Sequence, residues 1–180
     1  MIWSGNYSEE SGLAIKYGWF EMTAFMWACN NGHKDVVQLL LDHLGRIDLN
    51  ARVNNGWTAL MIACQKGENN IVKLLLDNSE RIELNVAGNY GSTAFMIACQ
   101  YGHKDVVQLF LDHSHRNIDL NVRDNWAKTP FINACLYRRK EVVKLLLEYP
   151  ELVNINMPEK MTISEEIKNL IEIHSMKFQI

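Results

Sequence analysis

One pattern of about twenty residues recurs along the chain, and this recurrence constrains the fold more than any other feature. The copies begin at Thr23, Thr58, Thr93 and Thr129, and they read TAFMWACNNGHKDVVQLLLD, TALMIACQKGENNIVKLLLD, TAFMIACQYGHKDVVQLFLD and TPFINACLYRRKEVVKLLLE. The spacings from one threonine to the next are 35, 35 and 36 residues. A fixed period in this range is the signature of stacked repeat units, each of which buries its apolar surface against its neighbours.

The first half of each copy predicts a short helix. Threonine is a favoured N-cap, and Pro130 follows Thr129 in the first turn, where proline is tolerated. Phe25, Ala28 and Cys29 lie at i, i+3 and i+4, which places them on one helix face. Glycine follows this helix in three copies, where a positive φ would end it: Gly32, Gly67 and Gly102.

The second half of each copy predicts a second helix, which in the first copy begins near Asp35. Its apolar stripe is Val36, Val37, Leu40 and Leu41. Neither helix is long enough to be stable alone, so the units must stack to bury both stripes. The sequence therefore predicts an all-α fold.

The pattern resembles the ankyrin repeat, whose signature runs Gly-x-Thr-Pro-Leu-His, Ala, Gly-His, a Val-Val-x-Leu-Leu-Leu run and a closing Asn. Gly56-Trp57-Thr58 and Gly91-Ser92-Thr93 match its opening, and Gly32-His33 and Gly102-His103 match its middle. The closing residues are Asn50, Asn85, Asn121 and Asn156. The resemblance covers residues 17–157, and it implies an ankyrin-repeat solenoid of helix–turn–helix units joined by β-hairpin-like loops.

The chain departs from this signature at two places. The signature histidine is replaced by an apolar residue in every copy: Met26, Met61, Met96 and Ile132. We expect apolar packing to replace the hydrogen bond of that histidine. Arg138 stands where the other copies have glycine, so we expect the turn of the fourth unit to be either strained or differently shaped.

The repeat divides the chain into an N-terminal segment, four repeats, and a C-terminal capping helix with a tail. These parts are residues 1–16, 17–52, 53–87, 88–123, 124–157 and 158–180. Segment 1–16 either forms a weak cap or marks the end of a longer array. In the last part, Thr162 and Glu165 predict a capping box, before a helix that covers Leu145 and Leu146. Its apolar spacing comes from Ile163, Ile167, Leu170, Ile171 and His174.

Cysteine follows alanine once in each unit, at Cys29, Cys64, Cys99 and Cys135. Equivalent positions of packed helices lie about 8–10 Å apart. A disulfide needs Cα atoms within about 7 Å, and zinc needs every sulfur at about 2.3 Å. We therefore expect free, buried thiols, with no disulfide, metal site or cofactor.

Histidines do not complete a reactive site either. His33 and His103 recur as turn residues, while His113 and His115 could hold a metal only adventitiously, since no third ligand is placed by spacing. A catalytic thiol would need a partner base and a lowered pKa. The sequence shows no phosphate-binding loop or nucleophile elbow. We expect a chain with no catalytic residues, and an enzyme that uses a repeat thiol stays as a weak alternative.

Composition bears on partners and compartment. A net charge of -3 carries no bulk signature of nucleic-acid binding. No apolar run approaches the roughly 18 residues of a membrane span, and the N-terminus does not read as a secretory signal. We expect a monomeric intracellular protein, in the cytoplasm, with the nucleus left open.

The resemblance implies that a partner binds on a concave face, made of the hairpin tips and the exposed ends of the first helices. These positions vary between units while the core positions repeat, which leaves them free for recognition. They are Arg52, Asn54, Asn55, Trp57, Gln65, Lys66, Asn89, Tyr90, Ser92, Gln100, Tyr101, Arg123, Asn125, Trp126, Lys128 and Tyr137.

This set is rich in aromatic and basic residues, and aromatic residues are enriched at binding hot spots. It predicts a protein-binding adaptor or scaffold module, whose partner protein or peptide has acidic and apolar character. We expect no small-molecule substrate and no membrane partner. The alternative is a single-stranded nucleic acid, whose bases would stack on the same aromatic side chains.

Overall fold

The computed structural model describes residues 22–42, 47–158 and 161–177. Within these residues the chain is helical and contains no strand, so the predicted all-α fold is confirmed. The inner helices are α2 (Ala24–Asn30), α4 (Ala59–Lys66), α6 (Ala94–Tyr101) and α8 (Pro130–Leu136). The outer helices are α3 (Lys34–Asp42), α5 (Asn69–Asp77), α7 (Lys104–Asp112) and α9 (Lys140–Leu147).

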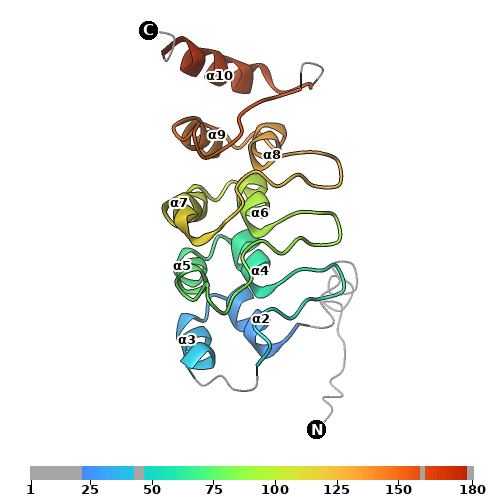
Figure 1. Cartoon of the computed structure of the whole chain (residues 1–180), viewed down its shortest axis with the longest axis vertical. Coiled ribbons are helices and arrows are strands. Elements are labelled where there is room, and N and C mark those ends of the chain that lie inside the picture. Colours follow the sequence, from blue (N-terminus) through green and yellow to red (C-terminus); the bar gives the residue numbers. More distant parts are fainter. Residues whose placement is uncertain (1–21, 43–46, 159–160, 178–180) are drawn as a thin grey trace.

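The helices form two columns (Figure 1). The inner helices stack in one column and the outer helices in the other, while the long loops project on the far side of the inner column. A short 3₁₀ turn, η2 (Ser114–Arg116), follows α7, and α10 (Glu165–Lys177) closes the C-terminal end. No helix of the described residues is long and apolar enough to cross a membrane. The predicted segment 1–16 lies outside the described residues, and the division points between repeats stay predictions.

Threonine begins each inner helix as predicted. The Oγ1 atom of Thr23 accepts a hydrogen bond from the backbone N of Met26 at 3.2 Å, and Thr58, Thr93 and Thr129 make the equivalent bond. These bonds satisfy one of the amide groups that a helix N-terminus leaves without a partner.

The turn that ends each inner helix needs a left-handed residue. Gly67 has φ 75° and Gly102 has φ 84°, and the backbone N of each donates to a carbonyl four residues earlier. Arg138 takes φ 57° at the same place in the fourth unit. Of the two alternatives expected there, the strained turn is confirmed, because a side chain disfavours this conformation.

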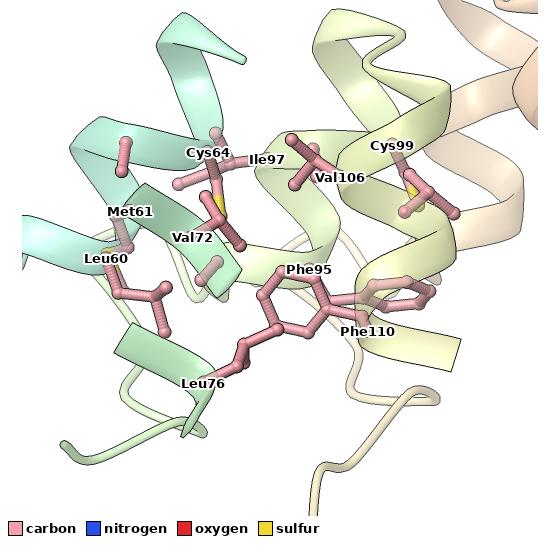
Figure 2. Packing of buried hydrophobic residues seen from close by; sticks show 14 of the residues in the cluster. Leu60, Met61, Cys64, Val72, Leu76, Phe95, Ile97, Cys99, Val106 and Phe110 are labelled. Carbon is pink, nitrogen blue, oxygen red and sulfur yellow. The ribbon is translucent and has the colours of Figure 1, made fainter. Parts of the chain in front are cut away.

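Apolar side chains from both columns form one continuous core. Phe95 of α6 and Phe110 of α7 lie with ring centroids 5.4 Å apart, and Figure 2 shows them with Cys64 and Cys99 in the same cluster. The residues that replace the signature histidine are also buried, as expected: Met26, Met61, Met96 and Ile132.

The first outer helix differs from the predicted stripe. Val37 and Leu41 are buried, but Leu40 is only half-buried and Val36 is 45% exposed. The equivalents of Val36 in later units are buried: Ile71, Val106 and Val142. Each of those outer helices packs against the outer helix of the preceding unit, whereas no described helix precedes α3 on this side.

The closing asparagine of a unit joins its loop to the next one. Asn85 Nδ2 donates to the carbonyl of Asn117 at 2.7 Å, and its Oδ1 accepts from the backbone N of Asp119 at 2.8 Å. Asn50 and Asn121 make the same pair of bonds to the loops that follow them. These amides therefore fix the spacing of successive units.

Helix α10 packs against α9 as predicted, with Ile167 buried, and Leu145 and Leu146 are covered. An ion pair between Lys140 and Glu166 links the two helices. The predicted capping box is wrong, because the helix begins at Glu165 and that residue therefore cannot occupy its third position.

Candidate functional site

The hairpin tips are tight turns set by their Asn and Gly residues. In the second unit, the backbone N of Val53 donates to the carbonyl of Trp57 at 3.0 Å, and Gly56, with φ 78°, donates to the carbonyl of Val53 at 2.7 Å. Asn55 Oδ1 accepts from the backbone N of Trp57 at 3.0 Å. A residue able to take a positive φ closes such a turn most easily, which is why glycine recurs there.

Several predicted binding residues instead join neighbouring hairpins. Asn89 Nδ2 donates to the carbonyl of Asn54 at 2.8 Å, and Asn125 Nδ2 donates to the carbonyl of Asn89 at 3.1 Å. Arg52 Nε donates to the carbonyl of Gly56 at 3.2 Å, and its Nη2 donates to that of Ala87. These side chains hold the hairpins in register. Some of their hydrogen-bond donors are therefore already engaged within the chain.

The large aromatic residues gather on one side of the molecule. Tyr90 and Trp126 are each 60% exposed, and their rings stack with centroids 5.8 Å apart. The Nζ atom of Lys128 lies 5.4 Å from the Trp126 ring centroid, a cation–π contact. We call the surface formed by Trp57, Tyr90, Tyr101, Trp126 and Tyr137 the aromatic face.

A cavity of about 200 Å³ opens on the aromatic face, between the hairpins and the inner helices. Eight of the predicted binding residues line it: Trp57, Tyr90, Ser92, Gln100, Tyr101, Trp126, Lys128 and Tyr137. The other predicted residues lie outside it: Arg52, Asn54, Asn55, Gln65, Lys66, Asn89, Arg123 and Asn125. The structure thus brings together half of the predicted set, drawn mainly from the third and fourth units.

Gln65 and Tyr101 join two inner helices at the edge of the cavity. Gln65 Nε2 donates to the Tyr101 hydroxyl at 2.8 Å, and the Tyr101 ring stacks on His103 with centroids 6.5 Å apart. His103 Nε2 in turn donates to the carbonyl of Gln65 at 2.8 Å. These contacts orient Tyr101, which makes this part of the surface rigid.

Four lining residues are not among the predicted binding residues: Gly88, Ile97, Asp124 and Asn133. Gly88 lies under the Trp57 indole, where a Cβ atom would come within 3.1 Å of Trp57 Cδ1. Asn133 was missed although the repeat contains a signal for it, because the equivalent residues are all apolar: Trp27, Ile62 and Ile97. A polar residue at an apolar repeat position is a departure that function can explain.

Two charged residues of opposite sign line the cavity, Asp124 and Lys128. Asp124 is buried, and its Oδ1 accepts from the backbone N atoms of Trp126 and Lys128, both at 2.9 Å. Arg52, Lys66 and Arg123 are exposed outside the cavity. These three cations lie in the hairpins and at the end of α4, and we call them the basic rim. The cavity itself contains one carboxylate and one ammonium group.

The cysteines have the character of buried core residues. All four are free and buried. Burial raises the pKa of Cys29 and of Cys135 from 9.0 to about 12. Burial, and then the neighbouring thiol, raises the pKa of Cys64 and of Cys99 well above 9.0. A protonated thiol is a poor nucleophile and a poor metal ligand, so these residues lack the activation that catalysis requires.

The histidine pair is also engaged within the chain. His113 Nδ1 donates to the carbonyl of Leu109 at 2.7 Å, and its Nε2 lies 3.1 Å from Asp77 Oδ1. His115 stacks on it with centroids 6.2 Å apart. Among the described residues, no group of three or more His, Cys, Asp or Glu side chains could hold a metal ion.

Comparison with models of known families gives a match that spans most of the chain. A family model described as ankyrin repeats (3 copies) matches the chain twice, over residues 7–87 and over residues 80–158. A search of curated proteins finds no match. The matched residues include the hairpins and inner helices that carry the aromatic face.

Proposed function

The chain belongs to the ankyrin-repeat family, and from this premise we propose that it is a non-enzymatic adaptor or scaffold that binds a partner protein through the aromatic face. Ankyrin repeats are generally protein–protein interaction modules. The observation that carries the proposal is the exposure of Tyr90, Trp126 and Tyr137 together around one cavity, since exposed aromatic residues that gather in this way are costly without a partner.

The partner segment combines apolar and acidic residues. Apolar side chains match the exposed rings, and acidic side chains match the basic rim of Arg52, Lys66 and Arg123. Asp124 is the one acidic residue that lines the cavity, and it is buried. This charge pattern supports an extended or loop segment whose acidic residues lie over the rim.

A single-stranded nucleic acid is the second candidate, because its bases could stack on the same rings. The net charge of -3 argues against it, since the chain as a whole repels a polyanion. Nucleic-acid binding would be recognised by an affinity for oligonucleotides that falls steeply as the salt concentration rises.

We also propose a cellular compartment and an oligomeric state for the chain. We propose an intracellular protein, in the cytoplasm, because four buried and unpaired thiols suit a reducing environment. We also propose a monomer, in which the aromatic face stays available to a different protein. Light scattering at micromolar concentration tests the second statement directly.

Peptide selection tests the proposed function with no assumption about the identity of the partner. A displayed library of random peptides is selected on the purified chain, and the affinity of the enriched peptides is measured by fluorescence anisotropy. We expect enrichment of acidic and apolar residues, and loss of at least about 30-fold in affinity in the Trp57→Ala/Trp126→Ala variant.

The matched control removes two exposed apolar side chains from elsewhere. Ile173 and Met176 on α10 are exposed, so Ile173→Ala/Met176→Ala makes a comparable surface change. It should keep the wild-type affinity. Equal loss in both variants, or unchanged affinity in the Trp57→Ala/Trp126→Ala variant with its circular dichroism intact, would overturn the proposal. So would salt-sensitive binding of an oligonucleotide with no enriched peptide.

A further inference from the structure

Asn133 presents a hydrogen-bond donor that the fold does not use. It lies on α8, is 3% exposed, and lines the cavity of the aromatic face. Its Nδ2 atom is buried and has no hydrogen-bond partner. A buried polar group without a partner costs stability, so its presence calls for an explanation.

The repeat shows that an apolar residue could stand in its place. The equivalent residues in the second and third units, Ile62 and Ile97, are both buried. The fourth unit therefore carries a polar atom where its neighbours pack a hydrocarbon side chain. A residue that lowers the stability of the fold, and makes no compensating contact, is typical of sites at which function selects the residue.

The size of the cavity limits what can enter it. Pockets for drug-sized ligands usually have volumes of about 300–1,000 Å³, whereas this cavity has about 200 Å³. It therefore suits one amino-acid side chain, with the rings of Tyr90 and Trp126 on one side. The remainder of the partner would lie over the hairpins and the rim.

The polar groups of the cavity define the chemistry of that side chain. Asn133 Nδ2 requires an acceptor. Asp124 also lines the cavity, and because its Oδ1 already accepts from two backbone N atoms, its other carboxylate oxygen is the acceptor for a donor beside it. Lys128 already lies over the Trp126 ring. A group that fits needs one acceptor, at least one donor and no net charge.

We propose that the cavity receives the side-chain carboxamide of a glutamine or asparagine of the partner. The carboxamide oxygen accepts from Asn133 Nδ2, its NH₂ group donates to Asp124, and the methylene groups pack against the aromatic rings. A carboxylate would meet the like charge of Asp124. A cation or an apolar side chain would leave the Asn133 donor without a partner.

This inference rests on the proposed function, because it names the residue that anchors the partner segment in the aromatic face. A neutral side chain in the cavity is also compatible with a partner segment that is acidic elsewhere. The acidic residues of the segment would lie outside the cavity, over Lys66 and Arg123, which are both exposed.

Three short probes test the inference by NMR spectroscopy of the ¹⁵N-labelled chain. They are acetyl-Gly-X-Gly-N-methylamide with X as glutamine, glutamate or methionine, so that only the glutamine probe carries a primary amide. We expect saturable shifts of the Asn133 side-chain NH₂ signals with the glutamine probe. Its dissociation constant should be about tenfold lower than that of either other probe, as expected for one further satisfied hydrogen bond.

Two variants separate recognition from folding. Asn133→Ile introduces the residue found at Ile62 and Ile97, so it should raise the melting temperature and remove the preference for glutamine. Asp124→Asn keeps an oxygen for the backbone N atoms of Trp126 and Lys128, but it turns the acceptor inside the cavity into a donor. It should reverse the preference, so that the glutamate probe binds more tightly than the glutamine probe.

The outcomes separate this inference from the proposed function. Peptides from the selection that lose affinity in Trp57→Ala/Trp126→Ala but bind Asn133→Ile as well as wild type would overturn the inference and leave the proposed function intact. Equal affinities for the three probes, or shifts that oligothymidine produces and the glutamine probe does not, would also overturn it. The inference would be supported if the wild type prefers the glutamine probe, Asn133→Ile loses this preference and Asp124→Asn reverses it.

Discussion

Buried thiols recur in this chain as small core residues. Cys64 and Cys99 lie in the cluster shown in Figure 2, among branched and aromatic side chains. Their burial favours the neutral thiol over the thiolate, because a charge is poorly solvated there. The cysteine of each repeated Ala-Cys pair thus serves core packing, and its thiol stays neutral.

Alkaline pH should destabilise the protein through these residues. The unfolded thiol loses its proton near pH 9.0, whereas the folded thiols of Cys29 and Cys135 keep theirs to about pH 12. Between these values the folded state binds more protons, so stability is fully present below pH 9 and falls as pH rises above it. The expected slope is about 1.4 kcal/mol per pH unit for each thiol.

Urea denaturation at a series of pH values from 7 to 11 measures this slope. The Cys64→Ala/Cys99→Ala variant serves as the control, and it should show a shallower decline, since burial raises the pKa of both removed thiols. In the native state at pH 8, iodoacetamide should alkylate the thiols far more slowly than a free peptide cysteine. Alkylation at the peptide rate would contradict the burial described here.

Single residues also mark the limit of what the sequence could predict. Repetition located the threonine caps, the glycine turns and the buried thiols, because each depends on local sequence. It could not show that Asn89, Asn125 and Arg52 join hairpins, since those bonds connect residues that lie about one repeat apart in the sequence and meet only in the folded chain. The repeat marks Asn133 as a polar residue at an apolar position, but its burial and its unpaired Nδ2 became known only from the structure.

At the scale of helices, the contact between successive units depends on close approach at the glycine turns. Gly67 has φ 75°, and a Cβ atom there would lie 2.5 Å from Nδ1 of His103. The His103 ring is held by its hydrogen bond to the carbonyl of Gln65. Neither the turn nor the ring can move without loss of the contact between α4 and the start of α7.

Gly67→Ala should therefore be more costly than Gly32→Ala. Both glycines have a positive φ, so both substitutions add backbone strain of about 1–2 kcal/mol. At Gly32 the new Cβ would meet only the carboxylate end of Glu68, at 2.9 Å from Oε2, and that flexible side chain can move. The difference between the two free energies of unfolding, from urea denaturation, isolates the packing against His103. Equal costs would contradict this account.

The helices themselves were predictable, but their ends and partners were less so. The predicted spacing of apolar residues placed α10 correctly against α9, although Ile163 lies before the helix, whereas the capping box at Thr162 and Glu165 was wrong. A Thr-x-x-Glu pattern needs the helix to begin directly after the threonine, and the chain between Thr162 and Glu165 is not helical. Val36 shows the same limit, because a sequence stripe cannot reveal which units have a neighbour on each side.

At the scale of the whole molecule, the stack places the outer helices and the aromatic face on different parts of the surface. The outer helices form one column beside the inner helices (Figure 1), and the asparagine bridges hold the units at fixed spacing. The inner helices and hairpins carry the aromatic face. The contrast between repeated and variable positions predicts that the variable positions bind the partner, and this stays a prediction. It could not predict that this cavity would be lined mainly by residues of the third and fourth units.

Charge on the rim should affect binding in a position-dependent way. Arg123→Glu changes the rim, whereas Lys73→Glu makes the same change of charge on the exposed surface of α5. We expect the first variant to weaken an acidic selected peptide by about tenfold, with a smaller effect at high salt, and the second to have little effect. Fluorescence anisotropy at low and high salt measures both. Equal effects would mean that net charge, and not the rim, attracts the partner.

The most direct test of the central claim is the affinity of one selected peptide for the Tyr90→Ala/Trp126→Ala variant. Both rings are 60% exposed, so their removal should leave the fold unchanged by circular dichroism. If the aromatic face is the binding surface, the dissociation constant rises at least about 30-fold, while Ile173→Ala/Met176→Ala keeps the wild-type value. A dissociation constant that is unchanged in the folded Tyr90→Ala/Trp126→Ala variant would contradict the account.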